Sequence, residues 1–546
     1  MLQSVSSFIK RGRTVVPDKY RNKKVVFFIA LVGLTMDNLN ITGALTTSFS
    51  MEEKFHASSN TISWALSAYA LTLGSFIILF GKLGDILGPH NTFIIGEAIM
   101  SLFSLLTAIP QPSIIALIVF RAFQGLGGAV LMPSGFALAA NYFQGKELEM
   151  AISWLTIVLT ASFGLGTVLG GAFSITNIGY QGFFYFTFAI SATCATLLYF
   201  LIIPIEQTEA HKNMRVKDLD FPGVSFLVIG LLLVIFGLTE AGITWNSPKV
   251  YVPIPIGAVL IIATILFESI FLSWYKRSHT HKVTRDLEVE GAKMKKDASL
   301  ASSIDSVDSI ESTDRSNWFM RVQLIFPKEV FQITNFPWLA FGVFSSYFTF
   351  VFIVSSLIQY TIFVEFNSPL LASVKILPMA VGTVLGSAIY KGKYALKVGI
   401  RNTIMLSVAV TLGSIIWISR TDYKVKNEYW IYQFVPLFLL GYAINLYFMV
   451  YLNAIMSQTP LHLQGLVSGI FQTFGQVAVA IGSALLSTIL GVLEYHRDDP
   501  AALEDQYKKF HNSFYAAIAI SGLFLILTLF IKDPYKGKET KEGERS

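Results

Sequence analysis

Charged residues are scarce in this chain of 546 residues: Asp, Glu, Lys and Arg make up 14% of it. An average soluble domain has about 25%. Apolar residues account for 53%, and there is a single cysteine, Cys194, which excludes an intramolecular disulfide framework. This composition predicts an integral membrane protein with no disulfide scaffold.

Sequence patterns typical of enzymes and of ATP-driven machines are also missing. The chain contains no Gly-x-x-x-x-Gly-Lys-Ser/Thr phosphate cradle. Its eight histidines fall in loops or at span ends without a metal-ligand cluster, and no Ser/His/Asp set can be assembled from it. We therefore expect no enzyme activity, no cofactor and no metal, and an ion gradient as the energy source.

Long apolar runs are what the chain has in abundance. A transmembrane helix needs about 20 apolar residues to cross a bilayer, and continuous runs of this kind exclude the alternating strands of a barrel. The fourteen predicted spans are 25–47, 61–80, 92–109, 113–140, 151–173, 183–203, 222–239, 251–274, 336–358, 369–390, 402–419, 430–456, 464–490 and 512–531. The sequence therefore predicts an all-α membrane protein with fourteen helices.

Lysine and arginine predict the orientation, because short cytoplasmic loops carry an excess of them. Most of the 41 basic residues fall in the tails and in alternate loops if the N-terminus is inside. Both termini are thus expected in the cytoplasm, and the net charge of +6 requires no nucleic-acid partner. The plasma membrane is the expected location, with the vacuolar membrane as the alternative.

Two loops suggest an internal repeat. "GKLGDILGPHN" (81–91) and "GKYALKVGIRN" (392–402) share Gly, Lys, Gly and Asn at the same offsets, after the second and the tenth span. Duplicated halves around a central site are a transporter architecture. The expected organisation is a cytoplasmic basic tail (1–24), a six-helix bundle (25–203), two linker helices (204–275), a disordered cytoplasmic loop (276–334), a second six-helix bundle (335–531) and another basic tail (532–546).

The loop 276–334 is polar and contains "SLASSIDSVDSIESTD". Few apolar residues and many Ser, Asp and Lys are typical of disorder. Ser303, Ser306 and Ser309 each precede an acidic residue by two positions, so the loop is either a phosphorylation target or a plain solvated spacer.

Arg121 lies within the fourth span, roughly 13 Å from the membrane surface, and Asp37 in the first span lies at a similar depth of roughly 15 Å. An arginine at a helix centre costs about 2.5 to 3.5 kcal/mol even on the lenient insertion scale, so a partner or a wet cavity is expected. We expect Arg121 and Asp37 to pair. Movement that separates the pair would load or release a proton, whereas a static pair would only lock two helices together.

Other polar and small residues follow the same spans. Gln124 and Gly125 lie on the arginine's side of its helix, where Gln124 either orients Arg121, contacts a substrate or packs. In the fifth span, "ASFGLGTVLGGAF" predicts a close and slidable helix contact. The candidates for lining a cavity, which are equally compatible with helix packing, are Asn40, Gln124, Tyr347, Gln359, Tyr360, Tyr442 and Asn445.

These motifs together resemble a family. "MDNLNITGAL", "GKLGDILGPH", "RAFQGLGG" and "SFGLGTVLGG" are similar to motifs of fourteen-helix members of the major facilitator superfamily, in the drug:proton antiporter group. The resemblance is strongest to the fungal subgroup of aminotriazole-resistance, boron-export and low-affinity ammonium transporters. It implies the major facilitator fold of two six-helix bundles plus two inserted helices.

The resemblance also implies roles for particular residues. Asp37 and Arg121 would serve proton coupling, and the expected gating positions are Gly81, Asp85, Gly88, Gly125, Gly127, Gly166, Gly170 and Gly171. Two positions depart from the family pattern. Pro89, His90 and Asn91 stand where basic residues are usual, and Thr167 stands where the fifth-helix antiporter motif usually has proline.

The function expected is proton-coupled export of small molecules or drugs by alternating access, by a monomer in the lipid bilayer. Thr167 favours one alternative, a facilitator of a small solute such as ammonium or boric acid. A second alternative is a membrane sensor that signals through the loop 276–334 and transports nothing.

Overall fold

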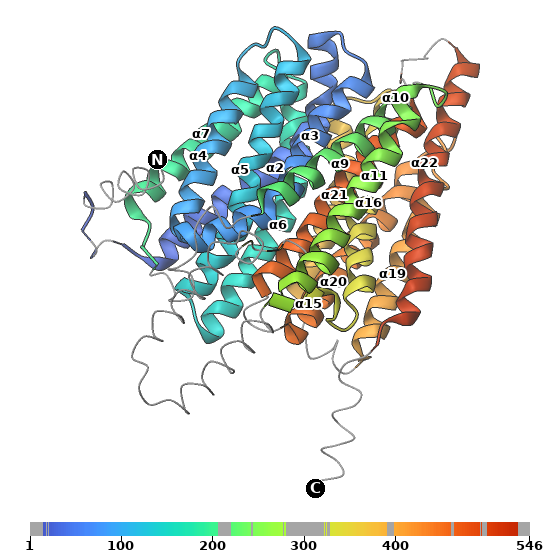
Figure 1. Cartoon of the computed structure of the whole chain (residues 1–546). Coiled ribbons are helices and arrows are strands. Elements are labelled where there is room, and N and C mark those ends of the chain that lie inside the picture. The colour runs from blue at the N-terminus through green and yellow to red at the C-terminus, as the bar shows by residue number, and fades with distance from the viewer. Residues whose placement is uncertain are drawn as a thin grey trace, which may run out of the picture.

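The computed structural model in Figure 1 is built from long helices that run roughly side by side. It describes residues 15–17, 19, 21–205, 220–241, 244–276, 278–279, 322, 324, 328–389, 398–459, 464–491, 493 and 499–532. Within these ranges the regular structure is entirely helical. The all-α class predicted from the sequence is confirmed.

Fourteen helices in the described residues are long and apolar enough to cross a membrane, as predicted. The long helices are α2 (Lys23–Phe55), α3 (Ser59–Leu87), α4 (Pro89–Ala108), α5 (Ile114–Tyr142), α6 (Gly145–Ser174), α7 (Tyr180–Leu201), α9 (Phe221–Ala241), α11 (Pro253–Leu266), α16 (Phe336–Phe363), α17 (Pro369–Ile389), α19 (Ile400–Ile418), α20 (Phe434–Gln458), α21 (Gln464–Leu490) and α22 (Pro500–Leu527). The short elements α10 (Pro248–Tyr251), η3 (Phe267–Leu272), η5 (Tyr429–Gln433) and η7 (Thr528–Phe530) extend α11, α20 and α22, and α15 (Lys328–Phe331) precedes α16.

Several helices are longer than their predicted apolar spans. The first was predicted over 25–47, but α2 runs from Lys23 to Phe55 and ends where His56 adopts a left-handed conformation with φ of 48°. Hydropathy detects only the apolar part of a helix, whereas the backbone hydrogen bonds continue into its polar ends. These spans were therefore placed correctly but predicted too short.

The helices form two six-helix bundles, α2–α7 and α16–α22, with the same internal contacts. In each bundle the first helix packs against the fifth and sixth, the second against the fourth, and the third against the fourth and sixth. Examples are α2 on α6 in the first bundle and α16 on α21 in the second. The duplicated architecture expected from the two similar loops is thus present in the packing.

The two similar loops also share one backbone turn. Gly88 before α4 has φ 85° and ψ 133°, and Gly399 before α19 has φ 91° and ψ 141°. This left-handed region favours glycine. In both helices the asparagine three residues later bonds the carbonyl before the glycine: Asn91 bonds Leu87, and Asn402 bonds Val398.

The two bundles meet along two seams. Helix α3 packs along α21, and α6 packs along α17. The inserted helix α9 contacts both α3 and α21, and α11 packs on α9 (Figure 1). The inserted pair therefore covers one seam from outside. We call the end of the molecule where α2 begins the N-side and the other end the far side.

Part of the loop predicted as disordered is ordered. Residues 280–321, including the three candidate phosphorylation serines, lie outside the described residues, as do most of the two basic tails. Near the end of the loop, however, Val322 and Val330 are completely buried, and the Lys82 ammonium donates to the Leu324 carbonyl at 2.5 Å. The prediction of disorder over all of 276–334 was wrong here, because these apolar side chains pack against the N-side ends of the helices.

Candidate functional site

Arg121 is completely buried in α5 and every part of its guanidinium has a partner. Its Nε donates to the Ala65 carbonyl of α3 at 3.1 Å, and its Nη2 donates to the Asn40 carbonyl of α2 at 2.9 Å. The third bond joins Nη1 to the Gln124 side-chain oxygen at 2.5 Å. Burial removes the water that would hydrate the guanidinium. Two backbone carbonyls and one amide oxygen take the place of that water as hydrogen-bond acceptors.

Tyr69 of α3 stands between Arg121 and Asp37. The Arg121 guanidinium lies 4.4 Å from the centre of the Tyr69 ring, and the Tyr69 hydroxyl donates a hydrogen bond to Asp37 Oδ1. Asp37 is completely buried, and its Oδ2 has no hydrogen-bond partner. One ring therefore links the cation and the carboxyl group.

We expected Asp37 and Arg121 to form a direct ion pair, but in the described residues these two side chains do not contact each other directly. The guanidinium takes carbonyl and amide acceptors, and the carboxyl group takes the Tyr69 hydroxyl instead. The two charges do share one buried cluster and neither faces lipid. Sequence reasoning missed Tyr69, because a tyrosine in an apolar span is usually an interface or packing residue.

Gln124 extends the cluster to α4 and α2. Its amide nitrogen donates to the Ser104 hydroxyl at 2.7 Å and to Asn40 Oδ1 at 3.0 Å. Asn40 in turn donates to the Met36 carbonyl at 2.8 Å. Gln124 and Asn40, both predicted as candidates, therefore belong to the Arg121 cluster, and Gln124 orients the arginine.

Glycines on α5 make this close packing of four helices feasible. A Cβ atom on Gly128 would lie 2.2 Å from Asp37 Oδ1, and one on Gly125 would lie 2.4 Å from the Tyr69 carbonyl. On another face, a Cβ atom on Gly127 would lie 2.9 Å from the Met100 nitrogen of α4. The glycines after Arg121 thus let α2, α3 and α4 approach the arginine.

Glu97 of α4 is a second buried carboxyl group near Asp37. It is completely buried, and neither oxygen has a hydrogen-bond partner. It lies against Gly33 of α2, one turn before Asp37, where a Cβ atom would be 1.8 Å from Glu97 Oε1. In the sequence, Glu97 lies about six residues from the end of its span, where snorkelling or a local partner is the ordinary explanation; its complete burial excludes snorkelling.

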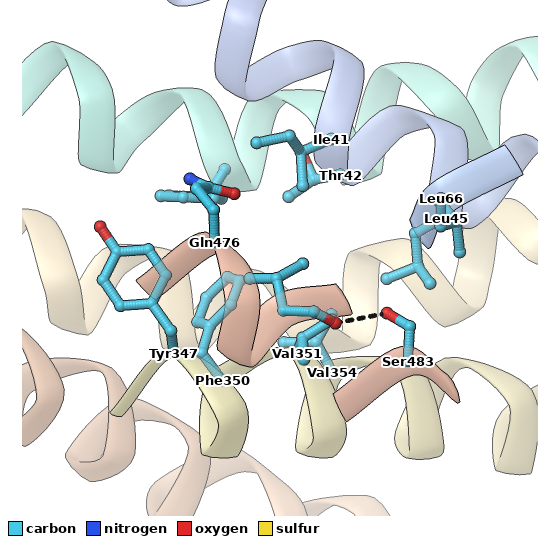
Figure 2. A pocket seen from close by; sticks show the side chains of 12 residues that line it. Ile41, Thr42, Leu45, Leu66, Tyr347, Phe350, Val351, Val354, Gln476 and Ser483 are labelled. Atoms are coloured by element: carbon cyan, nitrogen blue, oxygen red, sulfur yellow. Dashed lines mark hydrogen bonds between the residues drawn. The ribbon is translucent and has the colours of Figure 1, made fainter. Parts of the chain in front are cut away.

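A small cavity lies between the two bundles, close to the Arg121 cluster (Figure 2). It is lined by α2, α3 and α6 from the first bundle and by α16 and α21 from the second, with a volume of about 30 Å³. Such a volume holds about one water molecule. Its polar lining residues are Thr42, Tyr347, Gln476 and Ser483, and Gln476 Oε1 has no hydrogen-bond partner. In this conformation the bundles are closed on each other at this level.

Of the predicted cavity candidates in the second bundle, only Tyr347 lines this cavity. Its hydroxyl donates to the Gln472 side chain at 3.3 Å. Asn445 instead joins α20 to α17 through Ser387 at 3.0 Å, and Tyr442 lies in the same contact, beside Gly382 and Gly386.

The remaining two candidates lie at the far-side end of α16. Tyr360 donates to Glu428 at 3.1 Å, and the side-chain oxygen of its neighbour Gln359 has no hydrogen-bond partner. The tertiary structure therefore separates candidates that the sequence had grouped together.

The glycines of α6 face two ways. A Cβ atom on Gly166 would lie 3.0 Å from Leu39 Cα of α2, and one on Gly170 would lie 2.5 Å from the Gly43 carbonyl of α2. A Cβ atom on Gly171 would instead lie 2.9 Å from the Pro369 carbonyl of α17. Gly166 and Gly170 thus pack the first bundle internally, whereas Gly171, like Gly164 beside Ala380, faces α17 of the second bundle.

The predicted loop motif lies at the N-side ends of α3 and α4. Gly81 faces Pro133 of α5 at an ordinary contact distance, and Gly88 provides the left-handed turn. His90 accepts a hydrogen bond from the Ile205 nitrogen at 3.2 Å, which ties the end of α7 to this turn. The side chain of Asp85 lies outside the described part of the chain.

The sequence matches the pattern of the Major Facilitator Superfamily over residues 26–483 and 339–546. The chain belongs to this superfamily of membrane transporters. The low-affinity ammonium transporter of Saccharomyces cerevisiae is 25% identical over 85% of this chain and 79% of its own length. An efflux pump of Aspergillus terreus is 23% identical over 87% of this chain and 81% of that protein.

Further matches extend to drug-resistance proteins and to solved structures. The aminotriazole resistance protein of S. cerevisiae is 26% identical over 46% of this chain and 47% of its own length. A solved structure described in terms of proton-dependent oligopeptide transporters covers 93% of this chain and 99% of its own, with a TM-score of 0.57 and 12% identity. This major facilitator therefore has the superfamily's fold and relatives with efflux and resistance functions.

Proposed function

We propose that this major facilitator exports small molecules in exchange for protons. The observation that supports this most is Asp37, a completely buried carboxyl group with one unpartnered oxygen, linked to Arg121 through Tyr69. A carboxyl group in such a place changes its charge when the cation beside it moves. Proton uptake and release at Asp37 would then accompany the movement of the bundles.

The packing around the cluster supports coupling of this kind. Arg121 is anchored to carbonyls of α2 and α3, and α3 is also the helix that lies along α21 of the second bundle. Rocking of the bundles at this seam would displace Tyr69, and with it the hydrogen bond to Asp37. The substrate would enter between the bundles, where the small cavity now lies, once they part.

The proposed orientation rests on the basic residues, which are concentrated in the tails and in alternate loops. We place the N-side in the cytoplasm and the protein in the plasma membrane, as a monomer. Export then carries the substrate from the N-side to the far side while protons move the other way.

Purified protein in proteoliposomes tests the proposal. Pyranine trapped inside reports internal pH, and aminotriazole serves as the probe solute, with an imposed pH gradient. We expect aminotriazole to speed dissipation of the gradient with the native chain and not with Asp37→Asn. Asp505→Asn, at an exposed far-side residue paired with Lys509, is the control and should behave as the native chain. Equal responses in the native chain and Asp37→Asn would disprove the proposal.

A facilitator of a small solute is the second candidate. Thr167 keeps the backbone N–H that proline lacks, and α6 runs through it from Gly145 to Ser174. The similarity to the ammonium transporter and the small cavity also favour this function. Uptake of labelled methylammonium that ignores both the pH gradient and Asp37→Asn would support it.

A further inference from the structure

A second and larger pocket opens at the far side of the second bundle, away from the Arg121 cluster. Its volume is about 800 Å³, and it lies between the end of α16, the start of α17 and the segment that leads into α20. Glu365, Lys375 and Glu428 line it together with the rings of Tyr423, Tyr429 and Trp430. Two acids and one base thus share a wall whose other side chains are aromatic and apolar apart from Asn367 and Asn427.

Glu365 is the centre of this arrangement. Its Oε2 accepts hydrogen bonds from the Lys375 ammonium and, at 2.7 Å, from Asn367. Its side chain is 7% exposed, and Oε1 is buried with no hydrogen-bond partner. A buried carboxylate oxygen without a donor is costly, so this atom requires a proton or a cation.

Glu428 lies beside Glu365 and is also buried. One of its oxygens accepts from the Tyr360 hydroxyl at 3.1 Å. Burial, followed by the nearby Glu365 carboxylate, raises the pKa of Glu428 to about 8. The ionisable groups around it are Tyr360 of α16, Lys375 of α17, Tyr429 of η5, Tyr507 of α22 and Glu365 itself.

The charges in the cluster do not balance when both acids are ionised. Among the residues that line the pocket Lys375 is the only base, and it pairs with Glu365, so the cluster keeps one negative charge when both acids are ionised. A buried unpaired charge of this kind attracts one positive charge. A single proton satisfies both the charge and the free Oε1 of Glu365.

We propose that Glu365 and Glu428 form a binding site for one monovalent cation, which is a proton in acidic surroundings and a small primary ammonium ion when the proton is lost. An ammonium group supplies N–H donors for Glu365 Oε1 and for Glu428, and the faces of Tyr429 and Trp430 stabilise a cation. The pocket is open to the far side, so the ion enters without movement of the two bundles. The site is independent of the proton coupling proposed for Asp37.

Competition between the proton and the ammonium ion tests this assignment. Trp430 lines the pocket and is 62% exposed, so its fluorescence reports on the cluster. Subtracting the signal of Trp430→Phe removes the contribution of the other tryptophans. The detergent-solubilised full chain is titrated from pH 5 to 10 with and without methylammonium chloride. We expect a transition near the pKa of Glu428 whose midpoint falls by about one pH unit when methylammonium is at ten times its dissociation constant.

Two variants make the outcome specific. Glu428→Gln should abolish both the pH transition and the methylammonium effect, because it removes the titrating acid while keeping the size of the side chain. Asp505→Asn removes an exposed far-side acid that pairs with Lys509 of the same helix, outside the pocket lining, and it should change neither. A Trp430 transition that methylammonium leaves unmoved, or a methylammonium effect that survives in Glu428→Gln, would overturn the proposal.

Discussion

The Tyr69 hydroxyl of α3 donates its hydrogen bond to the Asp37 carboxyl group of α2, and both side chains are completely buried. The Tyr69 ring also contacts the Arg121 guanidinium, which lies over it at 4.4 Å from the ring centre. Tyrosine thereby keeps the acid and the base apart while both still act on it. A direct pair would neutralise itself, whereas this arrangement leaves one Asp37 oxygen free to take a proton.

Tyr69→Phe tests this link, because it removes the hydroxyl but retains the ring beside Arg121. Loss of a buried hydrogen bond to a charged group costs about 1.5 to 3 kcal/mol, so we expect gradient-driven transport to fall roughly tenfold or more. The measurement is substrate-driven proton flux in proteoliposomes. Tyr142→Phe, which removes a hydroxyl bonded to the Ile203 carbonyl in the same bundle, is the control. Unchanged coupling in Tyr69→Phe would rule out the bridging role.

Arg121→Lys tests the hydrogen bonds of the guanidinium, because lysine retains the positive charge but not the three donor positions. A single ammonium cannot reach the Ala65 carbonyl, the Asn40 carbonyl and the Gln124 oxygen together. With about 1 kcal/mol lost for each missing bond, we expect a drop of roughly 2 kcal/mol in the free energy of unfolding. Thermal unfolding in detergent measures it. A melting temperature equal to that of the native chain would mean that these bonds contribute nothing to stability.

Gly171→Ala should alter how the bundles meet rather than how each bundle folds. Its Cβ atom would lie 2.9 Å from the Pro369 carbonyl of α17, so the far-side ends of α6 and α17 must part. We expect greater labelling of a cysteine introduced near Ser373, with little change in melting temperature. Gly170→Ala, which faces the Gly43 carbonyl within the first bundle, should instead lower the melting temperature.

Gly413→Ala is the matched control for these glycine variants. A Cβ atom there has nothing within 4 Å, so both the labelling and the melting temperature should stay close to those of the native chain. Equal labelling in Gly171→Ala and Gly413→Ala would contradict the assigned role of Gly171.

Stability should depend on pH through Glu428, whose pKa is raised from the ordinary 4.5 to about 8 by burial and by Glu365. Between these values the folded chain holds a proton that the unfolded chain has lost, so unfolding releases it. The contribution of Glu428 to stability is therefore full below pH 4.5 and is lost as the pH rises to about 8. Melting temperatures across this range should fall with pH.

Two variants isolate the contribution of Glu428. Glu428→Gln should flatten the pH dependence, because the titrating acid is gone. Glu365→Gln should move the fall to lower pH, because the neighbouring negative charge is removed. A native pH profile that persists in Glu428→Gln would show that another group is responsible.

The sequence alone led to the class, the fourteen helices and the repeat. Apolar runs long enough to span a bilayer admit only helices, because every backbone polar group must be satisfied within the segment. The two similar loops revealed the repeat because each needs a glycine, Gly88 or Gly399, for a left-handed turn, and few other residues adopt that backbone conformation. Asp37, Asn40, Arg121 and Gln124 were found because charged or amide groups in an apolar span require compensation.

Only the tertiary structure decided how these groups are partnered. Tyr69 between Asp37 and Arg121, Glu97 against Gly33 and the Glu365–Glu428 pair all join residues from different helices. Depth along a helix can be estimated from residue number, but the direction in which a side chain faces its neighbours depends on how the helices rotate and pack. Hydropathy carries no information on that rotation, so the sequence identified the charges within the membrane and the packing chose their partners.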